Sequence, residues 1–160
     1  KLPKQIFVLS RVYTSLTNFG YTCVAYVVML LFFKIEPSVT MLLFPIPVFF
    51  ALLFSLGLGY LLSIVYVFFA DIKYLYSILL TLWMYMSAIF YPYESTAFIA
   101  QKIIMSNPVF IFIHFARQVV MYQTIPEPII WKKMIFWGVG MFLVGYYVFK
   151  QKENLVMQRV

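Results

Sequence analysis

The stretch of sequence that decides the fold is residues 45–73, which read PIPVFFALLFSLGLGYLLSIVYVFFADIK. Most of it belongs to an uncharged run, residues 37–70, that is too long for one membrane-spanning helix of about 20 apolar residues and too short for two. Pro45 and Pro47 indicate where the spanning helix begins within this run, because proline is tolerated in the first turn of a helix and disrupts a helix interior. We therefore predict one span over about 47–69, with an interfacial segment before it.

The composition of the chain points to lipid as its surroundings. Of its 160 residues, 64% are hydrophobic and 11% are charged, whereas soluble domains carry about 25% charged residues. The mean hydropathy is +0.94. A chain this short cannot hide so much apolar surface from water, and an aromatic content of 21% excludes intrinsic disorder.

Three further uncharged runs supply the other predicted spans. Residues 12–33 and 74–93 each match the length of one span. The shorter run 134–149 is extended because the two lysines before it can snorkel to the interface. The predicted fold is an all-α polytopic membrane protein with four transmembrane helices, at about 12–33, 47–69, 74–92 and 130–149.

Four spans place both ends of the chain, including the tail 150–160, on the same side of the membrane. Basic residues are more numerous on that side, so the positive-inside rule favours cytoplasmic ends. The side of the ends carries Lys1, Lys4, Arg11, Lys73, Lys150, Lys152 and Arg159, and the other side carries Lys34, Lys102, Arg117, Lys132 and Lys133. This distribution explains the net charge of +7 better than nucleic-acid binding does.

The apolar segment before the last span is interrupted by Asn107-Pro108. Ser95 or Thr96 can cap a short helix before the interruption, and Asn107 can cap a second helix that begins at Pro108. At 1.5 Å per residue neither helix is long enough to cross a bilayer. We therefore predict an outer pair of short re-entrant or interfacial helices over 96–123.

Few residues are available for chemistry. Cys23 and His114 are the only residues of their kinds, which excludes an internal disulfide and metal sites rich in cysteine or histidine. Gly140 and Gly145 have the spacing of a phosphate-binding loop, but Tyr146 stands where that loop requires lysine. We expect no catalytic residue, metal or cofactor in this chain.

Four motifs follow one another along the chain. They are KLPKQIFVLS at 1–10, VFFADIK at 67–73, MSAIFYP at 86–92 and NPVF at 107–110. In this order they resemble the membrane subunit (permease) of ATP-binding-cassette exporters of polysaccharides, teichoic acids and O-antigen. Two positions depart from the usual pattern of that family. Ala70 stands in place of an arginine, and Ala88 stands in place of a proline that would kink the helix.

The resemblance implies a six-span permease, of which this chain would be the carboxy-terminal part, beginning at a cytoplasmic coupling helix and lacking the first two spans. It implies a transport subunit rather than an enzyme, paired with a second copy in the bacterial plasma (inner) membrane. The expected cargo is a lipid-linked polysaccharide or teichoic acid. The expected partners are membrane lipids and a cassette ATPase that binds ATP and Mg, with no nucleic acid.

The resemblance also suggests roles for residues at the cytoplasmic side. The coupling segment 1–11 would dock on the ATPase, and its contact residues would be Leu2, Pro3, Lys4 and Ile6. The alternative is that its basic residues anchor the chain at lipid headgroups. Asp71 would contact the ATPase or a neighbouring loop, or would instead cap the third span.

Two helix faces could line a conduit. The candidates on the third span share one face and are Tyr76, Trp83, Ser87 and Phe90. Aromatic rings there can stack on sugars, and the alternative is packing against lipid or in the core. On the first span Asn18 and Tyr21 lie on a polar face, for which helix packing is the alternative. A row of small residues on the second span favours close helix packing and consists of Ser55, Gly59 and Ser63.

The outer hairpin supplies candidates for an outer gate, which are Asn107, Pro108, His114 and Arg117. His114 and Arg117 share a helix face that could meet a passing phosphate, and the alternative is a solvated face at the interface. Three other functions stay open: an exporter permease for drugs or other lipids, a membrane-embedded enzyme acting on lipid-linked sugars, and an anchoring subunit. The enzyme would need paired acids or histidine within the spans, and the anchor leaves the hairpin unexplained.

Overall fold

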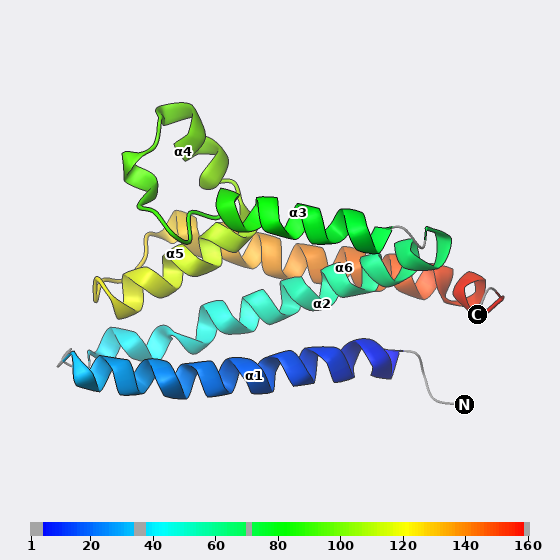
Figure 1. Cartoon of the computed structure of the whole chain (residues 1–160), viewed down its shortest axis with the longest axis horizontal. Helices are drawn as coiled ribbons and strands as arrows, with labels where there is room; N and C mark the ends of the chain where they lie inside the picture. The colour runs from blue at the N-terminus through cyan, green and yellow to red at the C-terminus, as the bar shows by residue number, and fades with distance from the viewer. Residues whose placement is uncertain (1–4, 34–37, 70–71, 159–160) are drawn as a thin grey trace.

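The computed structural model describes residues 5–33, 38–69 and 72–158, and within them it is built from helices without strands (Figure 1). The all-α polytopic prediction is confirmed. The elements are α1 (Gln5–Phe32), η1 (Val39–Leu43), α2 (Pro45–Phe68), α3 (Ile72–Met86), η2 (Tyr93–Ser95), α4 (Phe98–Ile104), α5 (Pro108–Val120) and α6 (Pro128–Gln158).

Three of the described helices are long and apolar enough to cross a membrane, namely Ser10–Phe32, Val39–Phe68 and Pro128–Lys152. The apolar part of α3, Tyr74–Met86, is shorter. Neither α4 nor α5 alone is long enough to cross a membrane. Taken together as one span they are long and apolar enough, and the two helices are bent by 92° at the break between them. This bent pair occupies the segment for which two short helices were predicted.

The first turn of α2 carries Pro45, as expected from the preference of proline for helix starts. The short helix η1 precedes it, and Ser38 caps η1 by accepting a hydrogen bond from the Thr40 amide. The Thr40 hydroxyl donates to the Val119 carbonyl at 2.9 Å. This bond fastens the entry of α2 to the end of α5.

Helices α2 and α6 pack closest to each other, and glycines on both helices allow their backbones to approach. A Cβ atom on Gly57 would collide with the Met141 carbonyl, and a Cβ atom on Gly145 would collide with the Gly57 carbonyl. Small residues allow this approach of two backbones in a membrane. Of the predicted packing row on α2 (Ser55, Gly59 and Ser63), Ser55 and Gly59 line a groove instead of this crossing.

The other elements surround this pair. Helix α5 packs across α2 and α6, α3 lies along one side, and α1 lies along the opposite side of α2 (Figure 1). The buried core between α2, α5 and α6 consists of Phe54, Ile111, Phe112, Phe115, Val119, Val120, Ile130 and Met134. The start of α1 and the end of α6 lie at one end of the bundle, and α4 stands out near the other end (Figure 1).

The third predicted span, 74–92, does not continue as one helix. Helix α3 ends at Met86, and the buried Ala88 adopts a left-handed conformation with φ of 45°. Proline cannot adopt that angle, because its ring fixes φ near −65°. The expectation that Ala88 removes a break in the helix was therefore wrong, since the helix stops here without a proline.

Candidate functional site

A buried polar cluster joins the end of α3 to the start of α5. The Asn107 side chain caps α5 by accepting from the Val109 amide at 3.0 Å, and it also accepts from the Trp83 indole at 2.8 Å. Its amide nitrogen donates to the Ser87 hydroxyl at 2.9 Å and to the Met86 carbonyl at 3.2 Å. One side chain thus satisfies a helix start and a helix end together.

Two cations bind backbone carbonyls at helix ends. The Arg117 guanidinium donates to the carbonyls of Ala88 and Ile89, at 3.1 and 2.8 Å. Lys133 on α6 donates to the carbonyl of Met105, which ends α4, at 3.1 Å. Positive charge near the end of a helix stabilises the exposed carbonyls there. Lys133 therefore holds the hairpin at the end of α4.

The cap predicted for the first short helix was wrong. Ala97 is the N-cap of α4, and it makes no side-chain cap hydrogen bond. The hydroxyls of Ser95 and Thr96 donate instead to the carbonyls of Pro92 and Tyr93, at 2.8 and 2.6 Å. They close the preceding turn, η2. The predicted cap of α5 by Asn107, with Pro108 in the first turn, is confirmed.

His114 on α5 lies buried within an aromatic cluster. Its ring is stacked on Phe110 at a centroid distance of 5.2 Å and meets Tyr93 edge-on at 5.4 Å. The imidazole thus packs as an aromatic ring.

A pocket of about 390 Å³ lies between α2, α3 and α5, and three of the predicted conduit residues line it. They are Tyr76, Trp83 and Ser87. Trp83 also meets Phe54 edge-on at a centroid distance of 6.3 Å. The hydrogen-bonding groups of Trp83 and Ser87 are already engaged with Asn107 and the backbone, so the walls offer ring faces and hydrocarbon.

Other predicted residues lie apart from this pocket. Phe90 is 70% exposed beyond the end of α3, and Asn18 and Tyr21 are exposed on α1. Leu2, Pro3 and Lys4 lie outside the described residues, as does Asp71. The backbone at Ile6 belongs to the first turn of α1.

Comparison with known proteins completes the description. Over 92 residues the chain is 34% identical to the O-antigen export system permease protein RfbA of Myxococcus xanthus. The resemblance to polysaccharide-export permeases is confirmed. The matched residues make up 58% of this chain and 35% of that relative, so the chain spans about a third of the length of this permease. No protein-family profile and no solved structure match the chain.

Neither the resemblance to a permease nor the predicted helices indicated which contacts hold the hairpin formed by α4 and α5. Two signals in the sequence point to it: Asn107 stands before a proline, and Arg117 follows within a short apolar helix. Neither signal says that the partners are Trp83 and the carbonyls after α3, because those contacts join residues from separate elements. The arrangement offers a pocket of aromatic and aliphatic side chains and joins it to the hairpin of α4 and α5.

Proposed function

We propose that this chain is part of a permease subunit that exports a lipid-linked polysaccharide or teichoic acid across the bacterial plasma membrane. The similarity to an O-antigen export permease carries this proposal. The helical membrane architecture, with its bent outer pair α4 and α5, supports it. In this proposal both ends of the chain face the cytoplasm, and two copies of the permease form the conduit.

The energy for export would come from a separate cassette ATPase. The printed sequence contains no phosphate-binding loop with the required lysine, so ATP and Mg would bind to that partner. The segment 1–11, with Leu2, Pro3, Lys4 and Ile6, would dock on the ATPase. This docking remains a prediction from the resemblance.

The pocket beside Trp83 would contact the cargo during passage. Tyr76 and Trp83 supply ring faces, which stack on sugars without a charge that would hold one sugar tightly. Conduction requires binding that is weak and spread over several positions. The outer pair, with Asn107, Pro108, His114 and Arg117, would close the exit.

The test uses the full-length protein purified together with its cassette ATPase. Lipid-linked glycan should raise ATP hydrolysis by the complex and should be moved across the membrane of proteoliposomes. The same lipid carrier without glycan is the control. An ATPase that neither binds this protein nor responds to lipid-linked glycan would refute the proposal.

A related permease function is the second candidate, in which the cargo is another amphiphile. The hydrocarbon character of the pocket walls favours it, since a glycan is not needed to fill an apolar pocket. The same assay separates the two: stimulation by the lipid carrier alone, or by an unrelated amphiphile, to the same degree as by the glycan-bearing lipid would favour this candidate.

A further inference from the structure

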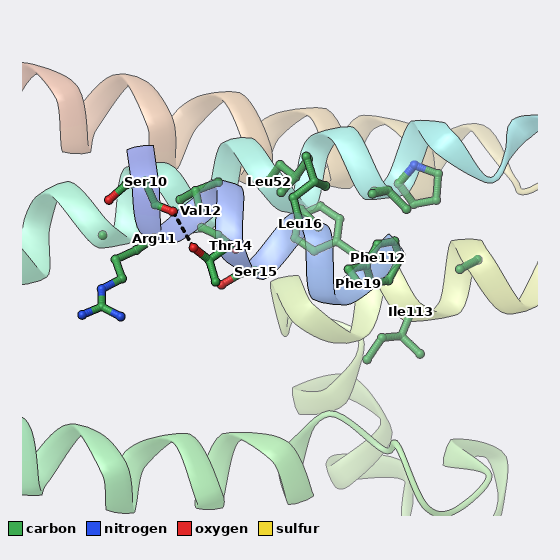
Figure 2. A pocket seen from close by; sticks show the side chains of 16 residues that line it. Ser10, Arg11, Val12, Thr14, Ser15, Leu16, Phe19, Leu52, Phe112 and Ile113 are labelled. Carbon is green, nitrogen blue, oxygen red and sulfur yellow. Dashed lines mark hydrogen bonds between the residues drawn. The ribbon is translucent and has the colours of Figure 1, made fainter. Parts of the chain in front are cut away.

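A groove of about 1050 Å³ runs between α1, α2 and α5, at the upper end of the range of about 300–1,000 Å³ that is usual for ligand pockets (Figure 2). It adjoins the pocket beside Trp83, which α1 does not reach, and four residues line both: Ala51, Ser55, Phe112 and Ile113. Most of its wall is apolar, with Leu16 and Phe19 from α1, Leu52 from α2, and Phe112 and Ile113 from α5. Its occupant must therefore carry a large hydrocarbon part.

One end of the groove is polar and positively charged. Ser10, Arg11, Thr14 and Ser15 line this end, and the Arg11 guanidinium extends outward from it (Figure 2). With the residues that the structure describes, Arg11 forms neither an ion pair nor a hydrogen bond. Its guanidinium is free to bind an anionic group in the fork geometry that suits phosphate.

Away from its polar end the groove is lined by an aromatic ring of α1. Phe19 lines this end and stacks on Phe44 at a centroid distance of 6.5 Å. At 1.5 Å per residue, the α1 wall from Arg11 to Phe19 is about 12 Å long, and the α2 wall from Pro47 to Gly59 is about 18 Å long. Half of a hydrocarbon core of about 30 Å is the thickness of one leaflet. The groove thus has the length of one leaflet, with its cation at headgroup level.

We propose that this groove binds one anionic phospholipid of the bilayer, with its phosphate at Arg11 and an acyl chain between α1, α2 and α5. Ser15 lies at the same polar end as Arg11, and the chain would fill the apolar length as far as Phe19. None of the spanning part of α1 is buried in the described chain, so a lipid here would fill the gap between α1 and the rest of the bundle. The proposal does not depend on the identity of the cargo.

The experiment uses the full-length protein in nanodiscs that contain a phospholipid with a photoactivatable acyl chain. Two probes are compared, phosphatidylglycerol and phosphatidylcholine with the same chain, and mass spectrometry locates the crosslinks. We expect phosphatidylglycerol to label the groove segments of α1, α2 and α5 about fivefold more than phosphatidylcholine does. This factor corresponds to the attraction of one basic side chain to anionic lipid. Equal labelling by the two probes would overturn the proposal.

Variants of the groove give the second arm. Arg11→Gln should reduce labelling by phosphatidylglycerol to the level of phosphatidylcholine, whereas Lys150→Gln, an equal loss of charge on exposed α6, should leave it unchanged. Ala116→Phe narrows the groove at its α5 wall and should reduce labelling by both probes.

Labelling that persists in Arg11→Gln refutes the phosphate assignment, and absence of labelling in the parent protein shows that protein fills the groove. If polyprenyl phosphate displaces the probe but excess phosphatidylglycerol does not, the groove is a carrier site and the proposal fails.

Discussion

Single side chains decide how the outer hairpin is joined to the bundle. Asn107 illustrates this, because its one amide bonds with residues 83, 86, 87 and 109. A buried amide with this many partners costs more to replace than its size suggests, since each partner left unsatisfied adds a desolvation penalty.

Asn107→Asp is a sharp test of this junction. The carboxylate still accepts from Trp83 and Val109, but it cannot donate to the Ser87 hydroxyl or the Met86 carbonyl. We expect a loss of about 2–4 kcal/mol in stability, because a buried charge is added and two acceptors lose their donor. Thermal unfolding of the purified protein measures it. An Asp variant as stable as the parent would contradict the assigned network.

Trp83→Phe separates the ring from its hydrogen bond. The phenyl ring keeps the contact with Phe54, whereas the donor to Asn107 is lost, so we expect a loss of only about 0.5–1.5 kcal/mol. Trp83→Ala also opens a cavity and should cost about 3–5 kcal/mol. Export measured per folded molecule then reports on the conduit. If Trp83→Phe exports normally and Trp83→Ala, once folded, does too, Trp83 does not contact the cargo.

Arg117→Gln tests the clamp at the end of α3. Charged hydrogen bonds to two carbonyls are lost, and we expect a decrease of about 1–3 kcal/mol in stability together with faster proteolysis near Ala88. Lys102→Gln is the matched control, since it removes one charge from the same hairpin where Lys102 only covers the Phe98 ring at 4.7 Å. Equal effects of the two substitutions would show that net charge, not the clamp, matters.

At the scale of elements, the α2–α6 pair depends on the absence of side chains. Gly145→Ala places a methyl group against the Gly57 backbone, so the helices must separate, and we expect a loss of about 2–4 kcal/mol. Gly140 lies on the same helix with nothing within 4 Å of a built Cβ atom, so Gly140→Ala should leave stability unchanged or raise it by up to about 1 kcal/mol. Thermal unfolding of both variants decides the matter, and similar results would argue against the close crossing.

Elements were also the scale at which the sequence was most informative. Uncharged runs and prolines predicted α1, α2, α6 and the bent pair, since length and apolarity are local properties. The end of α3 was missed because it depends on Ala88, whose left-handed backbone is held by Arg117 from another helix. The packing row was assigned to Ser55 and Gly59 because sequence shows small size but not which face meets α6. Of the four residues predicted on one face, Tyr76, Trp83 and Ser87 line one pocket with Phe54 and Phe112, whereas Phe90 lies apart because α3 ends before it.

At the scale of the whole molecule, the bundle has two distinct ends. The start of α1 and the end of α6 share one end, and the hairpin lies toward the other (Figure 1). Cytoplasmic ends therefore predict an external hairpin. In a Cys23→Ser background, Lys102→Cys and Tyr122→Cys, both at exposed positions, should react with an impermeant thiol reagent added outside.

The control for this topology is Lys150→Cys, exposed near the end of α6, which should react only after the membrane is opened. Reaction of Lys102→Cys from the cytoplasmic side alone would reverse the orientation. Reaction of Lys102→Cys and Tyr122→Cys from opposite sides would mean that α4 and α5 together form one broken span rather than a re-entrant pair.

The cations that hold the hairpin bind main-chain oxygens, and this determines which substitutions the hairpin can accept. Arg117 and Lys133 contact the carbonyls of residues 88, 89 and 105, and every amino acid presents the same carbonyl whatever its side chain. Replacing Ile89 or Met105 therefore leaves both acceptors in place, whereas replacing the cations does not. Substitutions at these two positions can thus change the surface of the hairpin while Arg117 and Lys133 continue to hold its backbone.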